Sequence, residues 1–210
     1  MHTDKNDHWS RKEGERMVQA DKKQMKARSL LDSAYDLFAS KGVHETSIDD
    51  IVKQARVAKG TFYLYFKDKY DVLDRIVLKK SSAVVSEGLR AMDEAMKQKP
   101  LDFEDRVLFF TDYVLHYLEQ NRKLLSIMYK NLSWGLVEQT AGIGEAHDAV
   151  EQFYTDIMER GRTRAEAQHI FYLVIELTGS AAYSTLIRRQ PCSLDEIRPT
   201  MYETIRRMIR

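Results

Sequence analysis

The 210-residue sequence has few of the residues that interrupt helices and almost none of the residue that forms disulfides. It contains three prolines and nine glycines, and Cys192 is its only cysteine. One cysteine excludes an internal disulfide and suits a reducing compartment. Strand-like alternation bounded by turn residues is also missing. Because 43% of the residues are hydrophobic, enough for a core, the sequence predicts an all-α protein in the cytoplasm.

A strong excess of charge of either sign is absent as well, because the formal net charge is +1. Bulk electrostatics therefore gives no indication of a nucleic-acid partner. The distribution is less even: residues 1–80 hold 17 Lys and Arg against 13 Asp and Glu, whereas residues 81–210 hold 16 against 19. The N-terminal part is thus the basic one, which places any contact with nucleic acid there.

Signals for export or membrane insertion are weak. The first twenty residues are charged throughout, so no signal peptide is expected. The longest apolar stretch, 170–187, has the length of a short membrane span but contains Glu176 and several hydroxyl side chains. A buried helix in a helical bundle explains it better, and no membrane partner is expected.

Patterns that carry catalysis or bind metal are also lacking. The six histidines have no tight metal-ligand spacing, and the sequence contains neither a glycine-rich phosphate loop nor a nucleophile elbow. The cluster Glu145, His147 and Asp148 is better explained as a solvated helix start. We therefore expect no catalytic residue, no metal site and no cofactor, and the protein is predicted not to be an enzyme.

The most informative stretch is 47–69, SIDDIVKQARVAKGTFYLYFKDK, which predicts two short helices joined by a tight turn. In the second, expected over 59–66, Phe62 and Phe66 are four residues apart and share a face. An isolated helix of this length is unstable in water, so both rings must be buried against a partner. The opposite face, formed by Gly60, Tyr63, Leu64 and Lys67, is then free to enter a DNA groove.

Residues 25–78 resemble the helix-turn-helix of the TetR family of bacterial transcriptional regulators. The resemblance is carried by T-S-I-x-x-I at 46–51 and A-x-V-x-K-G-T-F-Y-x-Y-F-K-x-K at 55–69. It implies an N-terminal three-helix helix-turn-helix domain and a C-terminal helical ligand-binding and dimerisation domain. The expected division is a flexible N-terminal extension (1–20), a DNA-binding domain (21–67) and a regulatory and dimerisation domain (68–210).

The resemblance also assigns roles to individual residues. The residues that it implies for DNA binding are Thr46, Ser47, Lys59, Gly60, Thr61, Tyr63, Leu64, Tyr65, Lys67 and Lys69. Two positions depart from the family pattern. Arg56 stands where the family usually has a glycine, so it is strained if its φ is positive. Ala58 stands where a serine is favoured, which removes a helix cap.

Further helices are expected after the motif, and the last two, 164–189 and 194–210, are the predicted homodimer surface. Small residues at 179–182 in the first of them permit close approach of another helix, either within the subunit or from a partner. Ser193 and Glu196 have the spacing of a capping box for the last helix. The other expected helices are 21–40, 68–97, 102–120, 123–134 and 144–160.

Aromatic and methionine residues recur at helical spacing between these helices. Such stripes are either a plain core or, as the resemblance implies, the wall of a cavity for a small-molecule effector. Arg106 is a further polar candidate beside this set. The predicted cavity residues are Phe109, Tyr113, His116, Tyr117, Met128, Asn131, Trp134, Phe153, Tyr172 and Glu176.

The sequence therefore predicts a sequence-specific DNA-binding regulator, a ligand-responsive repressor that acts as a homodimer on a palindromic double-stranded DNA operator. Two alternatives remain open. One is a helical small-molecule-binding protein, and the other is a transcriptional activator with the same DNA-binding module. Repressor and activator share the same binding chemistry, so the sequence does not choose between them.

Overall fold

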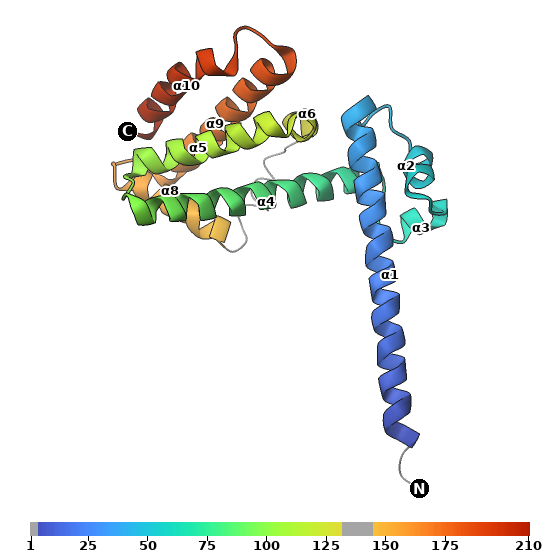
Figure 1. Cartoon of the computed structure of the whole chain (residues 1–210). Coiled ribbons are helices and arrows are strands. Elements are labelled where there is room, and N and C mark those ends of the chain that lie inside the picture. Colours follow the sequence, from blue (N-terminus) through green and yellow to red (C-terminus); the bar gives the residue numbers. More distant parts are fainter. Residues whose placement is uncertain (1–3, 132–144) are drawn as a thin grey trace. The chain divides into compact units, whose positions relative to one another are not determined.

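The computed structural model describes residues 4–131 and 145–210, with side chains for 22–129 and 145–210, and this part of the chain is helical without a strand. The all-α expectation is confirmed. The helices labelled in Figure 1 are α1 (Asp4–Lys41), α2 (Ile48–Ala55), α3 (Lys59–Tyr63), α4 (Lys69–Gln98), α5 (Phe103–Gln120), α6 (Arg122–Asn131), α8 (Glu145–Met158), α9 (Arg164–Tyr183) and α10 (Leu194–Ile209). The π-helical turn η1 (Ser184–Arg188) directly follows α9.

The chain forms two compact units, Met1–Ile76 and Val77–Arg210. Helix α4 is continuous across this division: its first eight residues belong to the first unit and the remainder to the second. The sequence places the division at the start of this helix, between residues 67 and 68. The structure places it more than two helical turns later, between Ile76 and Val77, because the beginning of α4 supplies Val72, Leu73 and Ile76 to the buried residues of the first unit.

The first unit is built around apolar residues of α1 to α4. Leu30, Ala34 and Phe38 are buried on α1, and Ile51 and Val52 are buried on α2. Their spacing of three and four residues is that of one helix face, so each helix contributes one apolar stripe. Helix α1 begins at Asp4 rather than at 21, so residues 4–20 of the expected flexible extension continue the helix.

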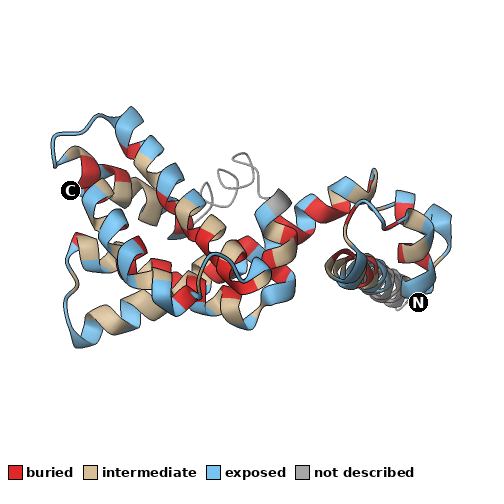
Figure 2. Cartoon of the chain, turned by 90° about the horizontal axis from the view of Figure 1, so that it is seen from above, coloured by how far each residue is buried: buried red, intermediate tan, exposed pale blue. Residues whose placement is uncertain are grey.

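The second unit has one contiguous core, to which α5, α8, α9 and α10 contribute most of the buried residues (Figure 2). Three helices of this unit, α5, α9 and α10, begin at side-chain caps. Asp102 caps α5, and Thr163 with Glu166 forms a capping box on α9. The predicted capping box of Ser193 and Glu196 is confirmed on α10. These caps satisfy the backbone N–H groups that have no partner within a helix start.

Helix α9 is the most apolar element. Together with η1 it is long and apolar enough to cross a membrane by length and composition, and 39% of its most apolar window is buried. It packs against α5, α6, α8 and α10. Of the small residues expected to admit another helix, Ala181 and Ala182 are buried in the core of their own unit. Tyr172 and Leu173 lie on the exposed side.

Candidate DNA-contacting segment and effector cavity

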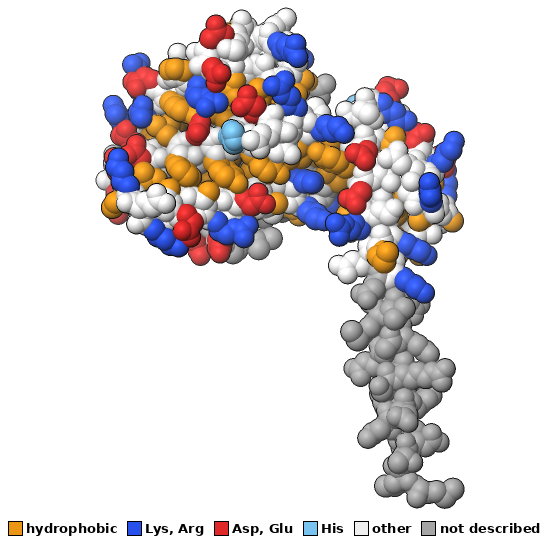
Figure 3. Space-filling view, in the orientation of Figure 1, with side chains coloured by type: hydrophobic (Ala, Val, Ile, Leu, Met, Phe, Trp, Pro, Cys, Tyr) orange, Lys and Arg blue, Asp and Glu red, His pale blue; other side chains and the backbone are white. Residues whose placement is uncertain are grey.

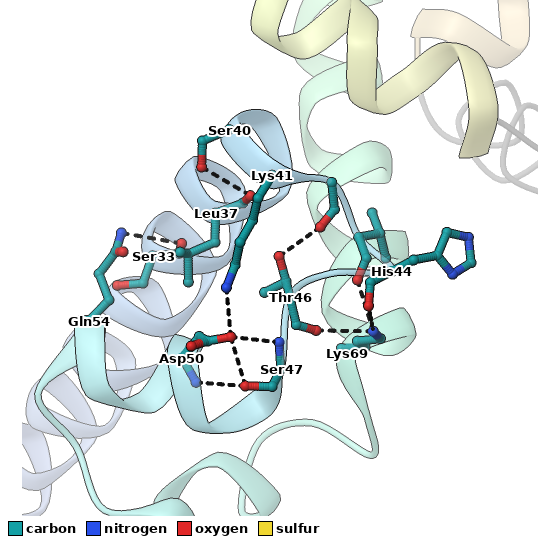
Figure 4. A network of polar contacts seen from close by, with 12 residues as sticks. Ser33, Leu37, Ser40, Lys41, His44, Thr46, Ser47, Asp50, Gln54 and Lys69 are labelled. Carbon is teal, nitrogen blue, oxygen red and sulfur yellow. Dashed lines mark hydrogen bonds and ion pairs between the residues drawn. The ribbon is translucent and has the colours of Figure 1, made fainter.

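Helix α2 begins at a network of polar contacts that fixes its first turn (Figure 4). Ser47 Oγ accepts from the backbone N–H of Asp50, and Asp50 Oδ2 accepts from the backbone N–H of Ser47. Lys41 at the end of α1 donates to the same carboxylate oxygen at 2.7 Å. The hydrogen bonds from Lys41 and Ser47 hold the pKa of Asp50 well below its usual range. The carboxylate therefore stays ionised and ties α1 to α2 at neutral pH.

Two residues expected to contact DNA have structural roles instead. Thr46 is 1% exposed, and its hydroxyl donates to the carbonyl of Gly42 at 2.7 Å. Lys69 Nζ donates to the carbonyls of Val43, His44 and Thr46 at 2.8–3.0 Å (Figure 4). An ammonium has three N–H donors, so all donors of Lys69 are used. These side chains hold the loop between α1 and α2, and a contact of either one with DNA stays a prediction.

The turn between α2 and α3 contains Arg56 with a positive φ, the conformation that the sequence analysis associated with strain. Arg56 adopts φ 56° and ψ 44°, the left-handed conformation in which glycine is usual. The N–H of Val57 donates to the carbonyl of Val52 at 3.0 Å, which closes the end of α2. Arg56 therefore replaces a glycine at a strain of roughly 1 kcal/mol. Ala58 precedes α3 and makes no side-chain cap, as its side chain predicts.

Helix α3 shows the two-faced arrangement expected from the sequence, although it is shorter than expected. It ends at Tyr63 rather than at Phe66, but the N–H of Phe66 still donates to the carbonyl of Phe62 at 3.0 Å. Phe62 is fully buried and Phe66 nearly so, with ring centres 5.6 Å apart. Tyr63 is 55% exposed and Leu64 is 75% exposed. The predicted reading face is therefore open to solvent.

The position of Phe66 is fixed from α4. The guanidinium of Arg75 lies 5.0 Å from the centre of the Phe66 ring, and Arg75 also pairs with Asp71 at 2.9 Å. Asp71 Oδ2 accepts in turn from the backbone N–H of Lys67 at 2.9 Å. The backbone after α3 is thus held in place while the Lys67 side chain remains exposed.

Lys59 at the start of α3 is engaged within the protein. Its ammonium lies 2.8 Å from Asp49 Oδ1 on α2, and the hydrogen bond with Asp49 raises the pKa of Lys59. Both side chains are more than half exposed. A phosphate that approaches Lys59 therefore has to compete with a carboxylate beside it.

Replacing Asp49 by asparagine is expected to strengthen operator binding by a factor of a few. The change frees Lys59 and removes a negative charge that repels phosphate, while an exposed ion pair contributes little to stability. Fluorescence anisotropy with labelled operator at several salt concentrations measures the effect. Asp32→Asn, which removes an exposed carboxylate paired with Arg28 on α1, is the control. Equal affinity of the wild type and Asp49→Asn would contradict a role for Lys59 at the phosphate backbone.

A cavity of about 350 Å³ lies inside the second unit. Helices α4, α5, α6, α8 and α9 all line it, and its wall is mostly apolar. Its size lies at the lower end of small-molecule pockets. Hydrophobic side chains also gather over α4 and α5 on the face of this unit seen in Figure 3.

Three of the predicted cavity residues line the cavity: Met128, Phe153 and Glu176. Arg106 lines it as well. Asn131 and Trp134 lie outside the residues whose side chains the structure describes. The other five are not among its lining residues, and for them a contact with the effector stays a prediction: Phe109, Tyr113, His116, Tyr117 and Tyr172.

The face of α5 toward the cavity contains Val107, Phe110, Thr111 and Val114, at spacings of three and four residues. Phe109 lies to one side of this stripe, whereas Tyr113 and Tyr117 follow Phe110 by three and seven residues and lie near its edge. Helical periodicity therefore does not by itself tell which aromatic residues of α5 reach the cavity. Tyr172 on α9 is 42% exposed and is not among the residues that line the cavity.

Gly88 on α4 packs closely against two aromatic rings of α5. A Cβ atom at Gly88 would lie 2.8 Å from a ring carbon of Phe110 and 2.9 Å from one of Tyr113. Any side chain would therefore have to push these rings aside. Because Phe110 is part of the cavity wall, the close packing at Gly88 also sets the shape of the cavity.

Asp156 is a cavity residue that the sequence did not reveal. It lies on α8, is mostly buried, and pairs with Arg106 on α5 through a contact of 2.7 Å. The two residues are 50 positions apart in the chain. No local pattern links them, so only the packing of α5 against α8 shows that they form a pair.

Comparison with known proteins places the first unit among bacterial regulators. Residues 30–76 match the model for bacterial regulatory proteins of the tetR family. The fatty acid metabolism regulator protein of Bacillus subtilis is 36% identical over 77 residues, which are 37% of this chain and 38% of that protein. AcrR of Shigella flexneri is 45% identical over 47 residues, 22% of each chain. The sequence matches to these two relatives thus span well under half of their length.

Solved structures match over most of the chain. The transcriptional regulator FadR from Bacillus subtilis, in complex with stearoyl-CoA, has a TM-score of 0.61 at 20% identity, covering 85% of this chain and 96% of that one. The fatty acid degradation regulator FadR from Bacillus halodurans has a TM-score of 0.58 at 21% identity, covering 86% and 94%. At these identities, the similarity establishes the fold of both units.

Proposed function

Because this chain belongs to the TetR family of bacterial regulatory proteins, we propose that it is a sequence-specific DNA-binding regulator whose operator affinity is controlled by an apolar effector. The observation that carries the proposal is the two-faced geometry at α3. Phe62 and Phe66 are buried on one side, and Tyr63 and Leu64 are exposed on the other. Tyr63 at the end of α3 and Leu64 directly after it are thereby placed to meet the edges of bases in a DNA groove.

The geometry of this segment indicates which of its residues would contact DNA. Tyr63 and Leu64 are the groove-facing candidates, Lys67 and Lys59 supply charge for phosphates, and Thr61 and Tyr65 are half-buried beside them. Gly60 is exposed, and a Cβ placed there would meet no atom of the described residues within 4 Å. Backbone can therefore approach DNA closely at this position. Ser47 contributes as the cap that orients α2.

The active form that we propose is a homodimer in the cytoplasm, bound to a palindromic operator as a repressor. One recognition helix reads only a few base pairs, and helix-turn-helix proteins gain affinity by pairing two of them. Helices α9 and α10 are the proposed dimer surface. On α9, Leu173 is 49% exposed and Tyr172 is 42% exposed, so the helix keeps an apolar side that a second copy would cover.

The effector that we propose has an apolar body that fills the cavity between α4 and α9. Two similarities support an acyl compound as the first class to test: the curated relative is named for fatty acid metabolism, and the FadR structure of similar fold contains stearoyl-CoA. Helix α4 lines the cavity with Ser81 to Met92 and continues into the first unit. A ligand that prefers one position of α4 would thereby alter DNA binding.

Alanine substitutions on the exposed face test the DNA-binding proposal. Tyr63→Ala and Lys67→Ala are each expected to weaken binding to the operator by about tenfold or more, because each removes a contact to the DNA backbone or a base edge. Lys67→Ala should also reduce the salt dependence of binding. Anisotropy or gel-shift measurements with DNA from upstream of the gene, at stated salt, give both quantities. The melting temperature should stay close to that of the wild type.

Lys53→Ala is a matched control, because Lys53 is exposed on α2 and carries the same charge outside the proposed face. Undiminished operator binding by both Tyr63→Ala and Lys67→Ala would refute the proposed interface.

A further inference from the structure

The cavity of the second unit has few polar side chains, and most of its hydroxyl donors are already used. Ser81, Thr111 and Thr178 each donate to the backbone carbonyl four residues earlier, at 2.7–2.8 Å. A hydroxyl that bonds to its own helix presents mainly its carbon atoms to a neighbour. These three positions therefore form part of an essentially apolar wall.

Arg106 is different, because its guanidinium has donors that the protein does not satisfy. Nη2 donates to Asp156 Oδ2 at 2.7 Å, and the guanidinium lies 5.9 Å from the centre of the Phe103 ring. Nε is buried and has no hydrogen-bond partner among the residues that the structure describes. A buried donor without an acceptor is unfavourable, so an acceptor on a bound molecule would be stabilised there.

The charge of Arg106 is nevertheless compensated. Asp156 faces it from α8, and Glu176 on α9 adds a second carboxylate to the cavity lining. Arg160 is exposed and donates to the backbone carbonyl of Asp156. Gln152 donates to Asp156 Oδ1 at 3.4 Å, so Oδ2 of the carboxylate is left to Arg106. Among the described lining residues, the charged groups are thus one guanidinium and two carboxylates.

This charge arrangement discriminates between ligand head groups. A carboxylate placed at Arg106 would lie beside the carboxylate of Asp156, and like charges repel strongly in a site of low dielectric constant. An uncharged carbonyl accepts a hydrogen bond from the guanidinium without that repulsion. It also leaves the pair of Arg106 and Asp156 intact.

We propose that the cavity selects a chain-like apolar ligand whose polar end is an uncharged ester or thioester carbonyl, which accepts from Arg106, and that Asp156 rejects the matching free acid. This inference rests on the proposed function, because it assumes that the cavity holds the effector. It goes further by naming the chemical state of the head group and the residue pair that reads it.

Methyl dodecanoate and dodecanoate test the inference, because they share one alkyl chain and differ in charge. Both are titrated below their aggregation limit into the full-length wild type and into Asp156→Asn, with binding followed by calorimetry. The wild type should bind the ester at least about tenfold more tightly than the acid. Asp156→Asn leaves Arg106 without a counter-charge, so the affinity for the acid should rise about tenfold while that for the ester changes little.

Glu151→Gln is the matched control, because it removes one carboxylate from the same helix at a position that pairs with Arg164 and does not line the cavity. Its preference for the ester should equal that of the wild type. A second variant replaces both partners, Arg106→Met with Asp156→Leu, and keeps an apolar wall. Its affinity for methyl dodecanoate should fall about tenfold, since the hydrogen bond to the carbonyl is lost.

An unchanged ratio of ester to acid affinity in folded Asp156→Asn would overturn the inference, as would the same change in Glu151→Gln. If Asp156→Asn does not fold, undiminished ester binding by the double variant overturns it. Absence of binding by both probes to the wild type also overturns it. Operator binding by the ligand-free protein is measured separately. If the ligand-free wild type does not bind the operator, the proposed DNA-binding function is refuted. An altered ligand preference would not refute it.

Discussion

Replacing Phe62 by alanine is expected to lower the free energy of unfolding of the first unit by about 3–5 kcal/mol, the usual effect of emptying a phenylalanine site in a core. Phe62 is fully buried and contacts the ring of Phe66. Without Phe62, α3 has too few residues to persist by itself. When α3 unfolds in this variant, operator binding should be lost as well. Hydrogen exchange of backbone amides in α1 and α2, followed in the full chain, measures the change.

Tyr63→Ala is the matched control for this experiment. Tyr63 is adjacent in sequence, carries a ring of similar size and packs edge-on against Phe62, but it is 55% exposed. Its removal should change stability by only about 0.5–1 kcal/mol while weakening operator binding. If both variants lost the same stability, the division of α3 into a buried and a reading face would be incorrect.

Replacing Lys69 by methionine is expected to destabilise the first unit by about 1.5–3 kcal/mol, the range for hydrogen bonds that involve a charged group. Methionine retains the length and apolar part of the side chain but has no donor. The carbonyls of Val43, His44 and Thr46 then lose their common partner, and the loop between α1 and α2 loosens. Thermal denaturation and amide exchange in residues 42–47 measure the effect.

Lys67→Met serves as the comparison, because it removes the same charge two residues earlier from an exposed side chain. The two variants should differ in which property they lose, operator binding or stability. Lys67→Met should weaken operator binding at nearly unchanged stability, and Lys69→Met should lose stability first. Wild-type stability of Lys69→Met together with weaker operator binding would restore Lys69 as a phosphate contact.

The local features of the DNA-binding segment were readable from the sequence because they depend on neighbours within one or two helical turns. The spacing of Phe62 and Phe66 sets a common face. In the second unit, Ser193 with Glu196 sets the start of α10 in the same local way. The departures at Arg56 and Ala58 were located for the same reason. The structure shows a left-handed residue at the first and an uncapped helix at the second. Both are properties of a few adjacent φ and ψ angles.

The features that the sequence did not show depend on contacts between distant residues. Lys69 appears in the sequence as one more base in a basic segment, but its donors reach carbonyls 23 to 26 residues earlier in the chain. The aromatic residues of α5 look alike in sequence, and only the packed structure shows that Phe110 lines the cavity. A sequence pattern shows which helix face is apolar. It does not show which of two apolar stripes meets which neighbour.

The sequence by itself therefore determined an all-helical chain, the position of its helix-turn-helix segment and the two faces of the recognition helix. Each of these follows from helical periodicity and from side chains close together in the chain. Only the tertiary structure decided which lysine is structural, which residues enclose the cavity, and that Arg106 meets Asp156 across 50 residues. Those outcomes require helices distant in sequence to be packed together, because only packing brings a buried charge to its partner.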